Sequence, residues 1–196
     1  MPRELEAFLA EGEAPIVFTY GSAMRQGADF FDTAVKICSR MGRRGVLLAP
    51  QGGQIPKPLP DGIIHLPYAP LSALLPRSAV LVHHGGVGTV AQALAAGIPQ
   101  LVVPVAFDHF DEGRRLKDRT LGATLSRRAF RPARAARVIN RLLTDPAVAR
   151  ACAEARARMA ESRDAITEAC DQLEALATSD ARTEAGQCRA GSGPGR

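Results

Sequence analysis

The chain has 196 residues and a formal net charge of +5, with 46% hydrophobic and 23% charged residues. This length suffices for one ordinary domain, and the N-terminus lacks the charged start and apolar core of a signal peptide. The four cysteines, Cys38, Cys152, Cys170 and Cys188, are far apart and form no C-x-x-C pair, which argues against a disulfide framework and a zinc site. We therefore expect a cytoplasmic α/β domain with reduced thiols and no bound metal.

Three short apolar runs in the first half of the chain predict β-strands. They are residues 16–20, 46–49 and 63–66. Between and after these runs we expect an amphipathic helix at 29–41, a loop rich in glycine and proline at 50–62, and a short helical turn at 71–75.

The middle of the chain, residues 79–104, predicts a strand, a glycine-rich loop, a helix and a second strand. The first strand is the apolar run 79–82, and a helix is expected to start near Thr89. Gly97 stands where a left-handed C-cap glycine is expected, and the next strand is 100–103.

The loop between the first strand and the helix reads HHGGVGT, residues 83–89. Gly85, Gly86 and Gly88 let the backbone turn sharply and approach a ligand without a Cβ. The loop directs unpaired helix N–H groups, and the positive end of the helix dipole, at one point. This arrangement predicts a phosphate-binding site.

A membrane span, a purely structural turn and a dinucleotide-binding loop fit this stretch less well. Glycines and prolines interrupt the apolar run 78–107 well before it reaches the length of a membrane span. A purely structural turn explains the glycines but not the adjacent His83. Residues 86–91 also fit the dinucleotide pattern G-x-G-x-x-A, but Asp108 lies too far past its strand to bind a ribose in that way.

The remainder of the chain continues the alternation. We expect a helix at 111–118 and a short strand at 123–125, and Pro132 and Pro146 suit the first residues of two helices. The alternation along the chain predicts the α/β class, with a Rossmann-like parallel sheet covered by helices on both faces.

Arginines are concentrated in one region of the second half. They are Arg127, Arg128, Arg131, Arg134, Arg137 and Arg141. Spacings of three and four place the last four on one side of a helix, which predicts a solvated face. A docking surface for a partner domain or for an anionic membrane is the alternative. Nucleic acid is not an expected partner, because no aromatic residues are interleaved with the arginines.

Several ordered motifs together resemble the donor-binding signature of the family 1 glycosyltransferases of GT-B fold, including bacterial rhamnosyltransferases and sterol or macrolide glucosyltransferases. The resemblance extends from about Pro2 to Ala160. The matching segments are VFTYGS at 17–22, YAP at 68–70, HHGGVGT at 83–89, GIP at 97–99 and PVAFDH at 104–109.

The resemblance implies that this chain is the C-terminal, donor-binding half of such an enzyme. A GT-B enzyme has two Rossmann-like halves, and the length of this chain suffices for one. Residues 1–14 resemble the linker that follows the acceptor half, residues 15–177 correspond to the nucleotide-sugar-binding domain, and residues 178–196 lack apolar periodicity and are expected to be disordered.

In the family the catalytic base, usually a histidine, belongs to the acceptor half. We therefore assign no catalytic residue to this chain and expect it to be inactive alone. Its expected partners are a nucleotide sugar and a separate N-terminal acceptor half, with peripheral membrane association and self-association as further expectations. The alternative functions are a non-catalytic nucleotide-sugar-binding remnant and a dinucleotide-binding Rossmann domain.

The resemblance also implies the roles of individual residues toward a UDP- or dTDP-hexose, the donor of an inverting transfer without a cofactor. The donor phosphates are assigned to Ser22, His83, Gly85, Gly86, Gly88 and Thr89. Tyr68 and Ala69 are assigned to the nucleobase. Asp108 and His109 are assigned to the sugar, and His109 replaces the glutamine of many relatives, which changes the hydrogen bonds offered to sugar hydroxyls.

Overall fold

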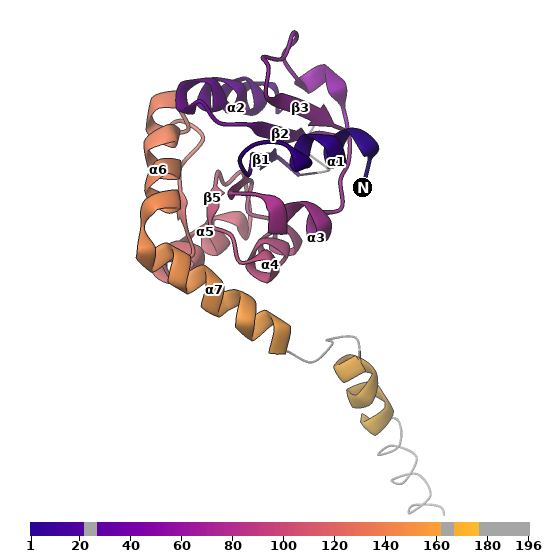
Figure 1. Ribbon diagram of the computed structural model, residues 1–196. Helices are drawn as coiled ribbons and strands as arrows, with labels where there is room; N and C mark the ends of the chain where they lie inside the picture. Colours follow the sequence, from indigo (N-terminus) through magenta and orange to yellow (C-terminus); the bar gives the residue numbers. More distant parts are fainter. Residues whose placement is uncertain (22–26, 162–166, 177–196) are drawn as a thin grey trace, which may run out of the picture. The chain divides into compact units, whose positions relative to one another are not determined.

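The computed structural model describes residues 1–21, 27–161 and 167–176 (Figure 1). It divides into two units, Met1–Met159 and Ala160–Arg196. The second unit is described only for residues 160–161 and 167–176, the latter as a helix with Leu173 and Leu176 exposed. The predicted disordered segment 178–196 lies outside the described residues.

The first unit is built on a six-stranded sheet in the order β3-β2-β1-β4-β5-β6, and every pair of neighbouring strands is parallel. The strands are β1 Ile16–Thr19, β2 Gly45–Leu48, β3 Ile63–Leu66, β4 Val80–His83, β5 Gln100–Val102 and β6 Gly122–Thr124. The strand order reverses between β1 and β4. Open α/β sheets bind ligands at such a switch point, outside the carboxyl ends of the strands.

Helices and short 3₁₀ turns connect the strands (Figure 1). The helices are α1 Arg3–Ala10, α2 Ala28–Met41, α3 Leu71–Leu74, α4 Val87–Ala96, α5 His109–Asp118, α6 Pro132–Thr144 and α7 Pro146–Glu161, and the 3₁₀ turns are η1 Gly52–Gln54 and η2 Leu75–Arg77. Among the described residues no helix is long and apolar enough to cross a membrane.

Two hydrophobic clusters cover the two faces of the sheet. On one face Ile16 and Phe18 of β1 pack with residues of α2 and α6, among them Phe31 and Ile139. On the other face Val17 packs with residues of α1, α3 and α4. Strands buried on both faces read as continuous apolar runs, as the sequence shows. The predicted α/β fold with helices on both faces is confirmed.

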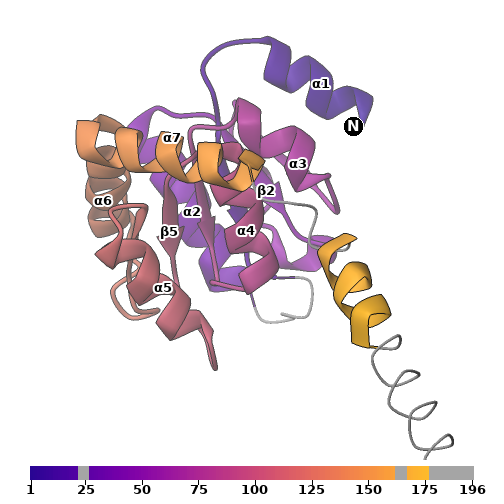
Figure 2. The same cartoon turned by 90° about the horizontal axis from the view of Figure 1, so that it is seen from below.

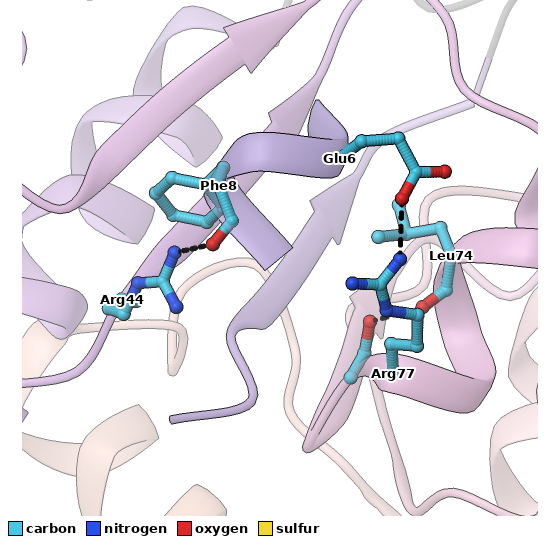
Figure 3. Close-up of polar contacts among 6 residues, drawn as sticks. Glu6, Phe8, Arg44, Leu74 and Arg77 are labelled. Atoms are coloured by element: carbon cyan, nitrogen blue, oxygen red, sulfur yellow. Dashed lines mark hydrogen bonds and ion pairs between the residues drawn. The ribbon is translucent and has the colours of Figure 1, made fainter. Parts of the chain in front are cut away.

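Helix α1 belongs to the second cluster and lies beside α3 (Figures 1 and 2). Its Leu5 is fully buried. Arg44 donates a hydrogen bond to the Phe8 carbonyl and lies over the Phe8 ring, and Arg77 forms an ion pair with Glu6 at 2.7 Å (Figure 3). The segment interpreted as linker-like therefore contains a helix that packs onto the sheet.

Most predicted elements occur within two residues of their expected bounds. Helix α4 begins at Val87, two residues before the expected Thr89, because Gly86 is extended and serves as the N-cap. Gly97 is the left-handed C-cap at a φ of 72°. Pro132 and Pro146 begin α6 and α7. These C-cap and proline predictions are confirmed.

The arginines of α6 occupy its exposed side. Arg134, Arg137 and Arg141 are exposed, while the buried residues of the helix include Ile139 and Leu142. Arg131 is the N-cap residue of α6 and makes no side-chain capping bond. These arginines therefore lie on an exposed helix face, which fits both the solvated face and the docking surface considered above.

Candidate functional site

The carboxyl end of β4 leads directly into the glycine turn and the N-terminus of α4. Gly85 has a φ of 108°, which favours glycine. The N–H groups of Thr89 and Val90 donate to the Gly86 carbonyl at 2.9 and 3.0 Å. The Gly86 carbonyl is the first acceptor of the helix, so the N–H groups of Val87 and Gly88 have no carbonyl of the helix to bond. They are the donors that this helix end offers to an anion.

The structure gives His83 a different place from the one predicted. Its side chain is fully buried, Nε2 lies 3.0 Å from Gln100 Oε1, and Nδ1 accepts the Gly85 N–H at 3.2 Å. Burial, together with the neighbouring His84, lowers the pKa of His83 to about 3. Both ring nitrogens are used inside the protein, so His83 holds the turn in place and leaves no atom for a phosphate.

The neighbouring His84 has a different environment from that of His83. His84 lines a cavity of about 370 Å³, a volume typical of ligand sites. The difference has a simple cause, because consecutive residues at a strand end point to opposite sides. His83 points into the protein, while His84 points toward the cavity. That alternation was readable in the sequence and is the signal that could have identified His84.

Residues from four segments line this cavity. They are Thr19, Gly21, Leu48, Pro50, Pro67, Tyr68, Ala69, Leu71, His84, Gly86, Val87, Gly88 and Thr89. The cavity thus lies at the carboxyl ends of β1 to β4, across the switch point of the sheet. It brings together five of the residues predicted for the nucleobase and the phosphates, namely Tyr68, Ala69, Gly86, Gly88 and Thr89.

Tyr68 and Ala69 have different accessibility within this cavity. The Tyr68 side chain is 72% exposed, whereas Ala69 is buried. Tyr68 therefore does not pack in the core, and its ring is accessible for stacking on a planar ligand.

The glycines of the turn serve different purposes. A Cβ on Gly85 would lie 3.0 Å from Val102 Cγ1 and 3.1 Å from His109 Cα, so Gly85 allows close packing inside the protein. A Cβ on Gly88 would meet nothing within 4 Å. Packing against the described residues therefore does not require a glycine at position 88, which is one of the residues that line the cavity.

The predicted sugar-binding residues lie beside the cavity and not among its lining residues. The side chain of Asp108 is 59% exposed and that of His109 is 15% exposed. The His109 ring packs against the His84 ring, with centroids 4.8 Å apart and planes at 89°. Phe107, just before them, is 91% exposed in a left-handed conformation with a φ of 53°. The predicted phosphate ligand Ser22 lies outside the described residues.

A second cavity of about 590 Å³ lies at the carboxyl ends of β1 and β5, on the side of α2 and α6. Tyr20 and Phe130 form part of its wall, and Arg127, Arg128 and Arg131 also line it. Burial raises the pKa of Tyr20, against the effect of Arg127. This larger cavity contains none of the residues predicted for the donor.

Comparisons with known proteins agree with this architecture. The family described as erythromycin biosynthesis protein CIII-like, C-terminal domain, matches residues 46–176. O-mycaminosyltylonolide 6-deoxyallosyltransferase of Streptomyces fradiae is 39% identical over 158 residues, covering 74% of this chain and 34% of that protein.

Solved structures of two glycosyltransferases have the same fold. Spinosyn forosaminyltransferase SpnP matches with a TM-score of 0.75 and 24% identity over 86% of this chain and 46% of its own. The calicheamicin glycosyltransferase CalG4 matches with a TM-score of 0.73 and 24% identity over 83% of this chain and 43% of its own.

The fold is therefore that of the C-terminal half of a GT-B glycosyltransferase of family 1. The chain belongs to the erythromycin biosynthesis protein CIII-like C-terminal domain family. It spans 34% of the length of the Streptomyces fradiae relative and less than half of either solved structure.

Proposed function

We propose that this chain binds a nucleoside diphosphate sugar and supplies it to a glycosyl transfer completed by an acceptor-binding half. The observation that carries the proposal is the cavity at the switch point of the sheet. It combines an exposed aromatic ring, a histidine and the N-terminus of α4, the three features that a nucleobase and a diphosphate require.

The diphosphate is proposed to lie at the start of α4. The N–H groups of Val87 and Gly88 and the Nε2 atom of His84 are its donors, and the helix dipole favours its negative charge. As the bond to the sugar breaks, charge develops on the leaving diphosphate, and fixed donors stabilise that charge without a metal. His84 replaces His83 in this assignment.

The nucleobase is proposed to stack on Tyr68 and to bond the backbone at Ala69. Stacking of a base on an aromatic ring contributes about 1 to 3 kcal/mol. The sugar would extend from the phosphates toward Asp108 and His109, because the His109 ring contacts His84.

We infer that the donor is a dTDP-deoxyhexose in preference to a UDP-hexose. This step uses the names of the relatives, among them a 6-deoxyallosyltransferase, a 2-deoxy-L-fucose transferase and a dTDP-epi-vancosaminyltransferase. The base that activates the acceptor hydroxyl in an inverting transfer is assigned to the acceptor half, as the family resemblance implies.

Calorimetry of the whole chain with dTDP, UDP and NADH tests this function. We expect dTDP or UDP to bind with roughly micromolar affinity or weaker, since half of a cleft offers fewer contacts than a complete one. NADH should not compete. Preference for NADH would instead identify a dinucleotide-binding domain, and robust sugar transfer by the pure chain would contradict the need for an acceptor half.

A further inference from the structure

The His84 ring lies between two glycines of the cavity wall. A Cβ built on Gly86 would be 2.6 Å from His84 Nε2, and one built on Gly21 would be 3.0 Å from the same atom. Neither residue has a side chain that would cover Nε2, and Gly21, Gly86 and His84 all line the cavity. Nε2 is therefore the ring nitrogen available to a bound diphosphate.

The other ring nitrogen of His84 has the opposite environment. Nδ1 is buried and has no hydrogen-bond partner among the described residues. A protonated imidazole carries N–H groups on both nitrogens, so a charged His84 would bury a charged donor without an acceptor, which is costly. A neutral ring with its proton on Nε2 leaves only a lone pair at Nδ1.

The surroundings of His84 also disfavour its protonated form. Besides the perpendicular His109 ring, the His83 ring of β4 lies 6.3 Å away, centroid to centroid. Burial and, to a smaller extent, His109 lower the pKa of His84 to about 4, while the carboxylate of Asp108 acts in the opposite direction. Among the described residues these are the titratable groups that face the ring.

His109 is fixed in contact with His84 by the start of α5. Its Nδ1 accepts the Ala106 N–H at 3.4 Å, which leaves the proton of a neutral ring on Nε2. Gly85 permits this approach, since a Cβ there would lie 3.1 Å from His109 Cα and Cβ. The His109 ring thus covers the His84 ring on the side where α5 begins.

We propose that His84 binds the donor diphosphate as a neutral imidazole that donates its Nε2–H, and that His109 is the positioning residue that keeps it neutral. This inference rests on the proposed function of the cavity. It differs from recognition by an imidazolium, because no proton is taken up when the donor binds.

The proposal predicts an affinity that does not change with pH. Nucleotide sugars are suitable probes because their diphosphate does not titrate near neutrality, so any pH dependence comes from the protein. If His84 had to be protonated, the affinity of dTDP-glucose would fall about tenfold for each pH unit above the pKa. We expect a flat profile from about pH 5 to about pH 8, where an ordinary histidine titrates.

Calorimetry of dTDP-glucose and UDP-glucose with the whole chain, in buffers of different ionisation enthalpy, measures proton uptake directly. We expect none. Uptake of about one proton for each bound sugar nucleotide would overturn the inference while leaving the proposed function intact. Absence of binding at every pH would instead refute the proposed function, and this inference with it.

Three variants test the positioning role. His109→Ala opens His84 to water, so binding should become tighter at acid pH, by up to about tenfold for each pH unit. His65→Gln is the control, because His65 is bonded to the Ala49 carbonyl at 2.9 Å on β3 and lies outside the cavity. His84→Ala should weaken binding about tenfold, the effect of one neutral hydrogen bond. A flat profile in folded His109→Ala would overturn the positioning role.

A measurement without ligand completes the test. The chain has four histidines, so ring nitrogen NMR can separate them, with His84→Ala identifying the His84 signals. We expect the free chain to show neutral His84 protonated on Nε2 down to about pH 5. An ordinary titration of His84 near its reference pKa of about 6.5 would contradict the proposal.

Discussion

Two adjacent histidines at the end of β4 have separate tasks, which their burial decides. His83 is fully buried between Gln100 and the Gly85 N–H, and His84 lines the cavity. Each depends on glycine nearby, because Gly85 provides the turn and Gly86 leaves room for the His84 ring. A Cβ at position 86 would clash with the His84 ring, whereas one at position 85 would crowd Val102 and His109.

Gly88 offers a clean test of the phosphate site. A Cβ at position 88 would meet no atom of the described residues within 4 Å, and aspartate in the first turn of a helix is favourable to the helix. We expect the variant to fold with unchanged or higher stability while binding of dTDP and UDP is lost, because the new charge repels the diphosphate. Thermal unfolding and calorimetry measure the two effects separately.

Gly53→Asp is the matched control. Gly53 is exposed, has equal open space around its Cβ direction and lies outside the cavity. Its substitution should leave nucleotide binding intact. Unchanged affinity in folded Gly88→Asp would mean that the start of α4 does not bind the phosphates.

The buried state of His83 predicts sensitivity to acid. Its pKa is about 3 in the folded chain, below the value of about 6.5 in the unfolded chain. The unfolded state therefore binds more protons between these values, and the free energy of unfolding should fall as the pH drops from about 6.5 toward 3. Urea unfolding at a series of pH values tests this prediction. A free energy of unfolding that increases as the pH is lowered through this range would contradict neutral burial of His83.

At the scale of elements, the helices differ in how well their sequences suit their ends. Helix α4 ends in a left-handed glycine whose N–H bonds the Ala93 and Leu94 carbonyls, a favourable arrangement. Helix α6 has Arg131 as its N-cap, no acidic residue in its first turn and no capping bond. Basic residues beside the positive end of the dipole are unfavourable.

Replacing the N-cap of α6 should stabilise the domain. Arg131→Asp introduces a carboxylate that can accept an N–H of the first turn, and we expect a gain of about 1 kcal/mol. That gain corresponds to an increase in Tm of roughly 2 to 4 °C. Arg137→Asp, within the exposed face of the same helix, is the control and should give a smaller gain. Equal gains would show that removal of positive charge, and not capping, is responsible.

Helix α1 should contribute to stability as part of the core. Leu5 is fully buried, while Leu9 is partly buried in the same cluster. We expect Leu5→Ala to cost about 2 to 5 kcal/mol of the free energy of unfolding, and Leu9→Ala to cost less. Denaturant titration measures both. A negligible effect of Leu5→Ala would mean that residues 1–14 act as a linker after all.

At the scale of the whole molecule, large apolar side chains remain exposed near the carboxyl edge of the sheet. Tyr68, Val87, Phe107 and Phe110 are between 56% and 91% exposed, and they flank the cavity and the start of α5. In solved relatives of this fold the chain accounts for less than half of the polypeptide. Exposed apolar patches of this kind favour association.

We therefore expect the isolated chain to self-associate through this edge. Sedimentation velocity over a range of concentrations should show reversible oligomers. The double variant Phe107→Ser and Phe110→Ser should reduce them, and the same exchange at Leu173 and Leu176, which are exposed on the helix 167–176, is the control. A monodisperse monomer at high concentration would contradict the expectation.

The sequence alone determined the features that depend on local signals. Apolar runs, the glycine turn, the left-handed Gly97 and the two helix-starting prolines are properties of neighbouring residues, and their elements occur within two residues of the predicted positions. The family resemblance likewise rests on short ordered motifs, and it identified the donor-binding half of the fold.

Only the tertiary structure decided which residues meet at the site. Tyr68 and His84 come from different connections and share a cavity because their parallel strands end at one edge of the sheet. The burial of His83 depends on Gln100 of the adjacent strand, and the packing of α1 depends on Arg44 and Arg77. These contacts join residues distant in the chain, so no local pattern predicts them. Side-chain burial and hydrogen bonding across the sheet assign each residue its role.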